Sequence, residues 1–415
     1  MSLQKLRSII LIISFSLLCW GAGFWWGTHG IKIKDQGSKI KDRIQIINKA
    51  VPADKNIDFA LFWQVWEKLE EKYLLKEKLD EKKMFYGAIQ GLTASLGDPY
   101  TVFLPPSDNK QAKEDLNGAF EGVGIQLGYK DNKLIVIAPL KGSPAEAAGV
   151  KAGDLILHLK DKNKNIDEDT LGISLPDAVE KIRGSKGTTI SLTLQREGED
   201  KPFTAEISRD TIVVPSVEVD FLDAKEATLA HLKLTRFGDL TSQQWDEAIE
   251  KIVDQGSKMK GVILDVRGNP GGYLKGAVNL ASEFLDKGIV VKQENYKGEI
   301  DSYSVNRKGR LLSLPLIVLI DKGSASASEI LAGALQDNVR AKLVGAVTFG
   351  KGTIQETEDL GVGAGLHITT AKWLTPKGTW VDKVGLKPDF EVENDIKKPD
   401  EDKQLQKAIE ILNNS

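Results

Sequence analysis

The run from Asp321 to Ile330 contains three serines, placed where an apolar stretch gives way to a helical pattern. A serine at a helix start combines a reachable hydroxyl with unsatisfied backbone N–H groups and a dipole that favours negative charge. Those are the requirements of an acyl-transfer nucleophile. Ser324, Ser326 and Ser328 are all candidates, and a plain serine cap is the simpler interpretation of this motif taken alone.

A candidate base is Lys351, which lies between two glycines in the segment 348–355. If this segment is extended, Lys351, Thr353 and Gln355 share one face. A lysine acts as a general base only when neutral, which requires burial to lower its pKa. Gln355 would then orient the amine, as a third group orients the base in a triad. A solvated surface lysine is the ordinary alternative for Lys351 alone.

A glycine turn supplies candidate donors for a developing oxyanion. A buried-strand pattern at 261–266 is followed by Asn269, Pro270, Gly271 and Gly272. We predict that Gly271 and Gly272 present main-chain N–H groups, because glycine allows the backbone to approach closely. A plain strand-to-helix turn is the alternative.

Histidine offers a competing base, as in Ser-His-Asp hydrolases. The four histidines are scattered and show no HExxH spacing. His231 and His367 lie in the same region as the serines. Both occupy strand-like runs, where a histidine is ordinarily structural, so a histidine base is the weaker hypothesis.

Composition limits the remaining classes of function. The chain has 415 residues, 41% hydrophobic and 28% charged, which excludes wholesale disorder and suggests two or three domains. The formal net charge of −3 argues against a general nucleic-acid binder. Cys19 is the only cysteine, so an intrachain disulfide and a cysteine-rich metal site are excluded. We predict neither a metal ion nor another cofactor.

The candidate residues fall in a region, 211–392, where strand and helix patterns alternate. This alternation predicts βα units around a mostly buried sheet. The expected strands are 227–234, 261–266 and 314–320, and the expected helices are 242–255, 274–285 and 326–336. A tail, 393–415, carries apolar residues at helical spacing from Asp402 to Leu412 and predicts a final helix.

Residues 118–210 form a separate module of short strands with a helix from about Leu175 to Arg183, which predicts a small, partly open barrel. Gly122 and Gly124 allow backbone N–H groups to converge into an anion-binding nest. The strand that follows offers an edge to which an extended peptide can add.

Two motifs in this module resemble the signatures of protease-type PDZ domains. They are the segment 120–125 (Phe-Glu-Gly-Val-Gly-Ile) and the glycine- and alanine-rich run 142–154. The resemblance implies a PDZ domain whose carboxylate-binding loop holds the C-terminus of a peptide. The loop residues are Gly122, Val123, Gly124 and Ile125.

Two further regions precede the PDZ module. Lys5 and Arg7 come before an apolar run from Ile9 to Trp26, close to the ~20 residues that span a bilayer. Basic residues before the run place the bulk of the chain outside the cytoplasm. We expect residues 1–30 to form an uncleaved membrane anchor, with a cleaved signal peptide as the alternative. For residues 31–117 we predict a linker followed by a helical region.

Together these features resemble the carboxyl-terminal processing proteases, serine endopeptidases with a Ser/Lys dyad. The similarity runs from about 58 to 390 and includes Gly-Asp-Pro-Tyr-Thr at 97–101 and Trp-Leu-Thr-Pro at 373–376. The resemblance implies that Ser326 is the nucleophile, Lys351 the base and Gln355 its supporting residue. It also implies oxyanion donors at Ala327 and at Gly272 or Gly271, and a gating role for Arg183.

The expected protein is therefore an α/β multidomain chain with an N-terminal helical region, a PDZ domain, an α/β protease core and a C-terminal helix. It would cleave exported or envelope proteins recognised by their free C-termini. The expected location is the cell envelope: anchored in the inner membrane with the catalytic part in the periplasm or outside, or secreted to the periplasm after cleavage. A homodimer and an activating adaptor are family-based candidates as partners. The alternative function is a non-catalytic PDZ adaptor or chaperone.

Overall fold

The computed structural model describes residues 57–414 apart from 225–226, 396–397 and 399–400. It divides into two compact units, residues 1–85 and 86–415, which we describe separately. The predicted membrane anchor and linker lie outside the described residues. Within the described residues, none of the helices has both the length and the apolar character needed to cross a membrane.

The first unit contains helix α2 (Ala60–Lys72), a short 3₁₀ turn η1 (Lys76–Lys78) and the first residues of α3 (Glu81–Ala94). Phe62, Trp63 and Trp66 of α2 pack their rings together, with centroids 5.0–6.1 Å apart. The two helices confirm the helical pattern expected for this part of the chain. The chain leaves α3 through Gly97, whose φ of 69° requires the left-handed region that glycine adopts without strain.

The PDZ module is a small barrel in the second unit. A sheet in the order β3-β4-β5-β7-β8 is joined by β6, which pairs with β5, while β2 pairs separately with β9. A core of aliphatic side chains fills it, including Val136, Leu159, Ile190 and Leu192. The elements are β2 (Ala119–Gly122), β3 (Ile125–Lys130), β4 (Lys133–Pro139), α5 (Pro144–Ala147), β5 (Leu155–Asp161), β6 (Ile166–Asp169), α6 (Leu175–Ile182), β7 (Thr189–Gln195), β8 (Phe203–Ser208) and β9 (Asp210–Val213).

The α/β core is built on a six-stranded sheet in the order β10-β11-β12-β15-β16-β19. Strands β10 and β11 are antiparallel, and each later pair is parallel. The strands are β10 (Val217–Ala224), β11 (Ala227–Leu234), β12 (Met259–Asp265), β15 (Leu316–Ile320), β16 (Lys342–Gly345) and β19 (Phe390–Glu391).

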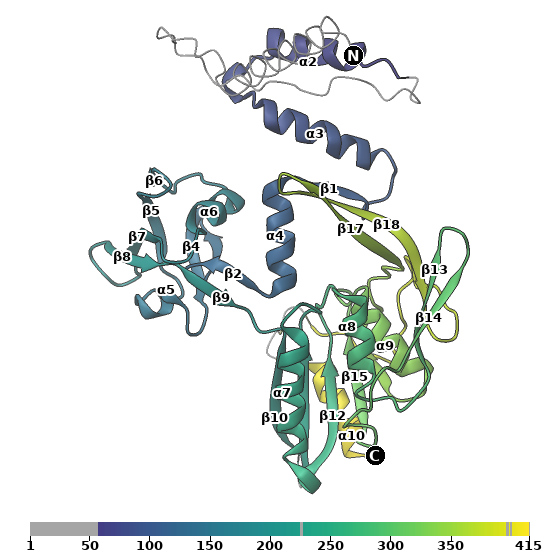
Figure 1. The fold of residues 1–415 in the computed structure, drawn as a ribbon. Coiled ribbons are helices and arrows are strands. Elements are labelled where there is room, and N and C mark those ends of the chain that lie inside the picture. The colour runs from purple at the N-terminus through teal and green to yellow at the C-terminus, as the bar shows by residue number, and fades with distance from the viewer. Residues whose placement is uncertain (1–56, 225–226, 396–397, 399–400, 415) are drawn as a thin grey trace, which may run out of the picture. The chain divides into compact units, whose positions relative to one another are not determined.

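Alternate strand residues bury against helices on the two faces of this sheet (Figure 1). Val262, Leu264 and Val318 pack toward α7 (Thr241–Val253), α8 (Leu274–Ala281) and α9 (Ala327–Asp337). Ile263 and Leu319 point the other way, onto α10 (Lys403–Asn413). The predicted βα units and the final helix are therefore confirmed.

A second sheet, which the strand patterns did not predict, stands beside α8 and α9 (Figure 1). Its order is β1-β18-β13-β14, and β17 pairs with β18. The elements are β1 (Val102–Leu104), β13 (Ile289–Asn295), β14 (Ile300–Ser304), β17 (Thr353–Gly361) and β18 (Ala364–Leu374); α4 (Pro106–Asn117) follows β1. This sheet matters for the site because β17 begins two residues after Lys351.

Candidate active site

Three serines of one turn have different environments. Ser324 is fully buried and its hydroxyl donates to the carbonyl of Val266 at 2.8 Å. Ser328 is also fully buried and donates to the carbonyl of Asn269 at 2.9 Å. Ser326 alone of the three is partly exposed. The two buried hydroxyls fasten the turn to the neighbouring loop, so Ser326 is the serine left accessible to a substrate.

The backbone at Ser326 is strained. Ser326 is the N-cap of α9 and has φ 55° and ψ −115°, outside the regions that non-glycine residues normally adopt. Strain of this kind costs roughly 1–3 kcal/mol and persists only where the surroundings impose it. The buried and hydrogen-bonded side chains of Ser324 and Ser328 on either side hold the turn in this conformation.

Glu329 joins the serine turn to the lysine loop. This carboxylate is fully buried in the first turn of α9 and accepts a hydrogen bond from the Ser326 amide at 2.9 Å. It also accepts from the amides of Gly350 at 2.8 Å and Lys351 at 2.9 Å. Thr348 Oγ1 donates a fourth bond, at 2.6 Å. One side chain therefore sets the spacing between the segments that carry Ser326 and Lys351.

The glycine turn faces Ser326 directly. A Cβ built on Gly271 would lie 2.9 Å from the Ser326 Cβ and 3.0 Å from the Ala327 nitrogen. The Gly271 amide itself donates to Asn269 Oδ1 at 2.9 Å. The Gly272 and Ala327 amides donate to no acceptor among the described residues. Ala327 follows Ser326 directly and Gly271 approaches it closely, so the unengaged amides of Ala327 and Gly272 are the candidate oxyanion donors.

Lys351 is half-buried, two residues before β17 begins. The indole of Trp373 donates to its carbonyl at 2.8 Å, and its Nζ lies 4.7 Å from the centre of the Tyr100 ring. Burial lowers the pKa of Lys351, while the charges of Asp98 and Glu329 oppose that shift. The direction of the shift is the one that a general base near neutral pH requires.

Gln355 lies on β17 with its side chain beside that of Thr353, as the extended pattern predicted. Its Nε2 donates to Thr353 Oγ1 at 2.9 Å and to Thr369 Oγ1 of β18 at 3.1 Å. The register with β18 shifts between Ile354 and Gln355. Both amide protons of Gln355 are therefore engaged with the sheet, which fixes the side chain and leaves its Oε1 to accept from a neighbouring donor.

Comparison with known proteins gives three family matches along the chain. Residues 17–107 match the activating protease CtpB N-terminal domain, 122–207 the PDZ domain and 228–392 peptidase family S41. The carboxy-terminal processing protease CtpB of Bacillus subtilis is 33% identical over 96% of this chain and 78% of its own length. The carboxyl-terminal-processing protease of a Picosynechococcus species is 37% identical over 86% of this chain and 85% of its own length.

The chain belongs to the carboxy-terminal processing proteases. It is a PDZ-containing serine peptidase, so the predicted enzyme class and fold class are confirmed and a non-catalytic adaptor is disfavoured. A solved S41 protease from Bacteroides fragilis shares the fold, with a TM-score of 0.54 and 16% identity over 85% of this chain and 97% of that one.

Among the described residues, neither His231 nor His367 forms a hydrogen bond with Ser326. His231 Nε2 pairs with Asp265 Oδ2 at 3.0 Å, and Arg267 donates to the same carboxylate at 2.6 Å. Burial alone would raise the pKa of Asp265, but these hydrogen bonds hold it far below its ordinary value. His367 sits on β18, where burial and the charge of Lys351 lower its pKa.

Arg267 also joins the turn that precedes Gly271 and Gly272 to α10 and its N-cap. Its guanidinium donates to both carboxylate oxygens of Asp402 at 2.9 Å and to Gln404 Oε1 at 3.0 Å. Asp402 caps α10 by accepting from the Leu405 amide. The position of the segment from Arg267 to Gly272 therefore depends on residues near the end of the chain.

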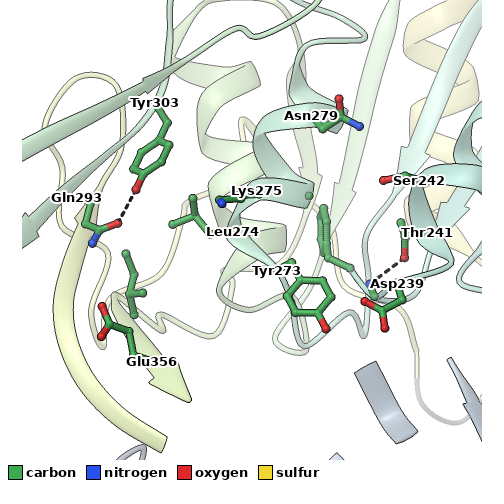
Figure 2. Close-up of a pocket in the computed structure, with 14 residues that line it drawn as sticks. Asp239, Thr241, Ser242, Tyr273, Leu274, Lys275, Asn279, Gln293, Tyr303 and Glu356 are labelled. Carbon is green, nitrogen blue, oxygen red and sulfur yellow. Dashed lines mark hydrogen bonds between the residues drawn. The ribbon is translucent and has the colours of Figure 1, made fainter. Parts of the chain in front are cut away.

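An open groove of about 650 Å³ begins next to the turn that holds Gly271 and Gly272 (Figure 2). Tyr273 follows Gly272 directly, and Ile354 and Glu356 of β17 line the opposite side. Figure 2 shows Gln293 and Tyr303 on one side, joined by a 3.1 Å hydrogen bond, and Tyr273 with Asp239 on the other. The groove has both polar and apolar walls, which suits peptide side chains of different kinds.

One glycine of the predicted PDZ loop adopts a backbone conformation and a close approach that exclude a side chain. Gly124 has φ 76°, and a Cβ there would lie 2.4 Å from the Ser143 Cβ, so no side chain fits. Strand β3 begins at the next residue, Ile125. The predicted loop residues thus stand together at the start of a strand, as peptide addition requires.

Arg183, the predicted gating residue, ends α6 and reaches out of the PDZ fold. Its Nη1 donates to Glu114 Oε2 of α4 at 3.0 Å, and its guanidinium lies 4.6 Å from the centre of the Phe120 ring. Helix α4 continues to Asn109, whose Nδ2 donates to the Gly363 carbonyl between β17 and β18. A chain of contacts therefore leads from the PDZ loop region to the hairpin that carries Gln355.

Sequence reasoning did not assign roles to Glu329 and Tyr100. Both stand in motifs that the resemblance includes. The Ser-x-x-Glu spacing of Ser326 and Glu329 is a capping-box pattern and would have pointed to the Glu329–Ser326 contact. The contact between Tyr100 and Lys351 joins residues 251 positions apart (351 − 100), and a single sequence carries no local signal of it.

Proposed function

We propose that the chain is an endopeptidase in which Ser326 is the nucleophile and Lys351 the general base. One observation carries the proposal: Ser326 is the accessible serine of its turn, and Glu329 ties that turn to the loop of a buried lysine. The open amides of Gly272 and Ala327 beside it support an oxyanion site made of these two groups.

The proposed mechanism follows the protons that Ser326 and Lys351 give and accept. Neutral Lys351 accepts the proton of the Ser326 hydroxyl as the oxygen attacks a peptide carbonyl, and the oxyanion receives hydrogen bonds from Gly272 and Ala327. The lysine then gives its proton to the leaving amine. Water, deprotonated by Lys351, attacks the acyl-enzyme, and Ser326 regains its proton as the acid product leaves. Gln355 Oε1 restrains the Lys351 amine in this scheme.

We assign substrate selection to two surfaces. The loop from Gly122 to Ile125 would bind the C-terminal carboxylate of a protein while its last residues add to β3 as a strand. The groove beside Tyr273 would receive side chains near the scissile bond. Its mixed polar and apolar lining supports cleavage at varied sequences, with selection made mainly by the C-terminus.

The proposed setting is the cell envelope, with an anchor at Ile9–Trp26 and substrates among exported proteins. If this segment is cleaved as a signal peptide, we place the enzyme free in the periplasm. Exposed apolar side chains on the N-terminal helices, among them Leu61 and Leu92, support a homodimer through this region. An activating adaptor is a further proposed partner, and it rests on the family resemblance alone.

A cleavage assay tests the dyad. Full-length protein in detergent is incubated with a fluorogenic peptide that has a free apolar C-terminus, beside Ser326→Ala and the control Ser302→Ala on exposed β14. We expect the wild type and the control to cleave, and Ser326→Ala to lose at least about 10³-fold in kcat. Cleavage by Ser326→Ala would remove Ser326 as the nucleophile, and cleavage by none would point to a gated enzyme that awaits a partner or to the PDZ adaptor.

Arg183→Ala tests the proposed gating. An internal fluorogenic peptide with an amidated C-terminus is the substrate, and a second peptide with a free apolar C-terminus is added to occupy the PDZ domain. We expect the second peptide to stimulate the wild type, and Arg183→Ala to lose at least about tenfold of that stimulation while binding the peptide unchanged, because the Glu114 contact is gone. Lys186→Ala, an exposed PDZ variant, is the matched control. Equal stimulation in Arg183→Ala would contradict the gate.

A further inference from the structure

A tyrosine from outside the α/β core covers the proposed base. The face of the Tyr100 ring lies 4.7 Å from Lys351 Nζ. Tyr100 belongs to the segment 97–101, which enters β1 and precedes the region matched by peptidase family S41. The lysine loop itself supplies no side chain that could close this side, since Gly350 and Gly352 flank Lys351.

The turn that carries Tyr100 is fixed by its own side chains. Asp98 accepts from the Tyr100 amide at 3.0 Å and from Thr101 Oγ1 at 2.7 Å. Thr101 is buried, and its Oγ1 accepts from the Thr369 amide of β18 at 3.1 Å. Thr369 Oγ1 in turn accepts from Gln355. The ring is thus held by the same strand that holds the residue supporting Lys351.

We propose that Tyr100 is a positioning residue for the general base: its ring covers the Lys351 amine and keeps water from it. The inference rests on the proposed dyad and deepens it, because it gives a structural cause for the burial of a lysine whose surroundings include the carboxylates of Asp98 and Glu329. The ring also limits the directions in which the four-carbon side chain of Lys351 can turn. The amine is therefore directed along the ring face.

The charges around Lys351 make this cover necessary. Asp98 of the turn and Glu329 of α9 both favour the ammonium form and would raise the pKa of Lys351. Burial and the charge of Asp382 both raise the pKa of Tyr100. Burial and the charge of Lys351 both lower the pKa of His367 on β18. The pKa of Lys351 is nevertheless lowered, and burial is the cause. Attraction of the ammonium to the ring face opposes this lowering, and the pH profile of Tyr100→Ala measures which of the two effects of the ring is larger.

Removing the ring should therefore raise the pKa of the base. In Tyr100→Ala, water reaches Nζ and solvates the ammonium, so less Lys351 is neutral at a given pH. Each unit of upward shift reduces the neutral fraction tenfold at pH values below both pKa values. We expect kcat/KM at pH 7 to fall at least tenfold and to recover at higher pH. Tyr100→Phe keeps the ring and should retain the wild-type pH profile.

The experiment measures kcat/KM from pH 5 to 10, together with the rate at which a fluorophosphonate labels Ser326, which reports the base without peptide binding. Full-length wild type, Tyr100→Ala, Tyr100→Phe and the control Tyr296→Ala are compared; Tyr296 is exposed at a hairpin tip. Thr101→Val, which loosens the turn without changing charge, should shift the profile in the same direction. Melting temperatures and PDZ-peptide binding confirm that the variants are folded.

The outcomes separate this inference from the proposed function. An alkaline shift in Tyr100→Ala, with Tyr100→Phe unchanged, supports it. A loss that is the same at every pH, or an equal loss in Tyr100→Phe, overturns it, because then the backbone or the hydroxyl is responsible. If Tyr100→Ala does not fold, an unchanged profile in Thr101→Val overturns it as well. Cleavage by Lys351→Ala would instead overturn the dyad on which the inference rests.

Discussion

Glu329→Ala is expected to lower kcat at least a hundredfold and to reduce the melting temperature. The Glu329 carboxylate is fully buried and accepts hydrogen bonds from Ser326, Thr348, Gly350 and Lys351. Removing it leaves these donors unpaired in the interior, at about 1–3 kcal/mol each. The two reacting segments also lose their shared anchor, and a displacement of about 1 Å can cost ~100-fold in rate. Steady-state kinetics and thermal unfolding of the full chain measure both effects.

Glu329→Gln is the sharper variant because it preserves side-chain volume. Its NH₂ group would face backbone N–H donors in place of one carboxylate oxygen, so we expect most of the loss to remain. Glu218→Gln, on exposed β10, is the matched control and should behave as wild type. A Glu329→Gln enzyme with wild-type kcat would show that the spacing of the two loops is set elsewhere.

Lys351→Met is expected to abolish cleavage while leaving the protein at least as stable as wild type at neutral pH. A positioned general base contributes about 10²–10⁴-fold, and here the same group activates both the serine and the water. The loss should therefore reach at least about 10³-fold in kcat. PDZ-peptide binding, which involves other residues, should persist. Stopped-time cleavage assays and peptide titration on the same samples measure the two properties.

The lowered pKa of Lys351 determines the direction in which the substitution changes the free energy of unfolding. The folded-state pKa of Lys351 is lowered by burial, so the unfolded chain binds more protons between the folded pKa and 10.5. The free energy of unfolding therefore rises with pH across that window, and below it the folded state carries the full cost of a buried ammonium. Methionine removes this cost. A melting temperature at pH 7 well below that of the wild type would contradict the sign.

The sequence predicted those site residues that lie within recognisable turns. Gly271 and Gly272 follow a buried strand, and Lys351 stands between glycines, so local pattern was enough to name them. It did not choose among Ser324, Ser326 and Ser328 without the family resemblance. The choice depends on burial, which two hydrogen bonds to residues 58 and 59 positions away create.

Contacts between distant segments were beyond the sequence pattern. The second sheet joins β1 to β18, with Phe103 opposite Leu366. Strand pairs between residues so far apart leave no periodic signal in the sequence. The same holds for Tyr100 over Lys351 and for Arg267 with Asp402. The limits proposed for the domains and the fate of residues 1–30 stay predictions.

The bond between Arg267 and Asp402 bears on the order in which the enzyme is made. A ribosome adds residues from the N-terminus, so the serine turn and the lysine loop are synthesised well before Asp402 and α10 exist. Until then Arg267 lacks its second carboxylate, and strand residues such as Ile263 and Leu319 lack the helix that covers them. The segment that carries Gly271 and Gly272 therefore gains its full set of contacts only after Asp402 and α10 have been synthesised.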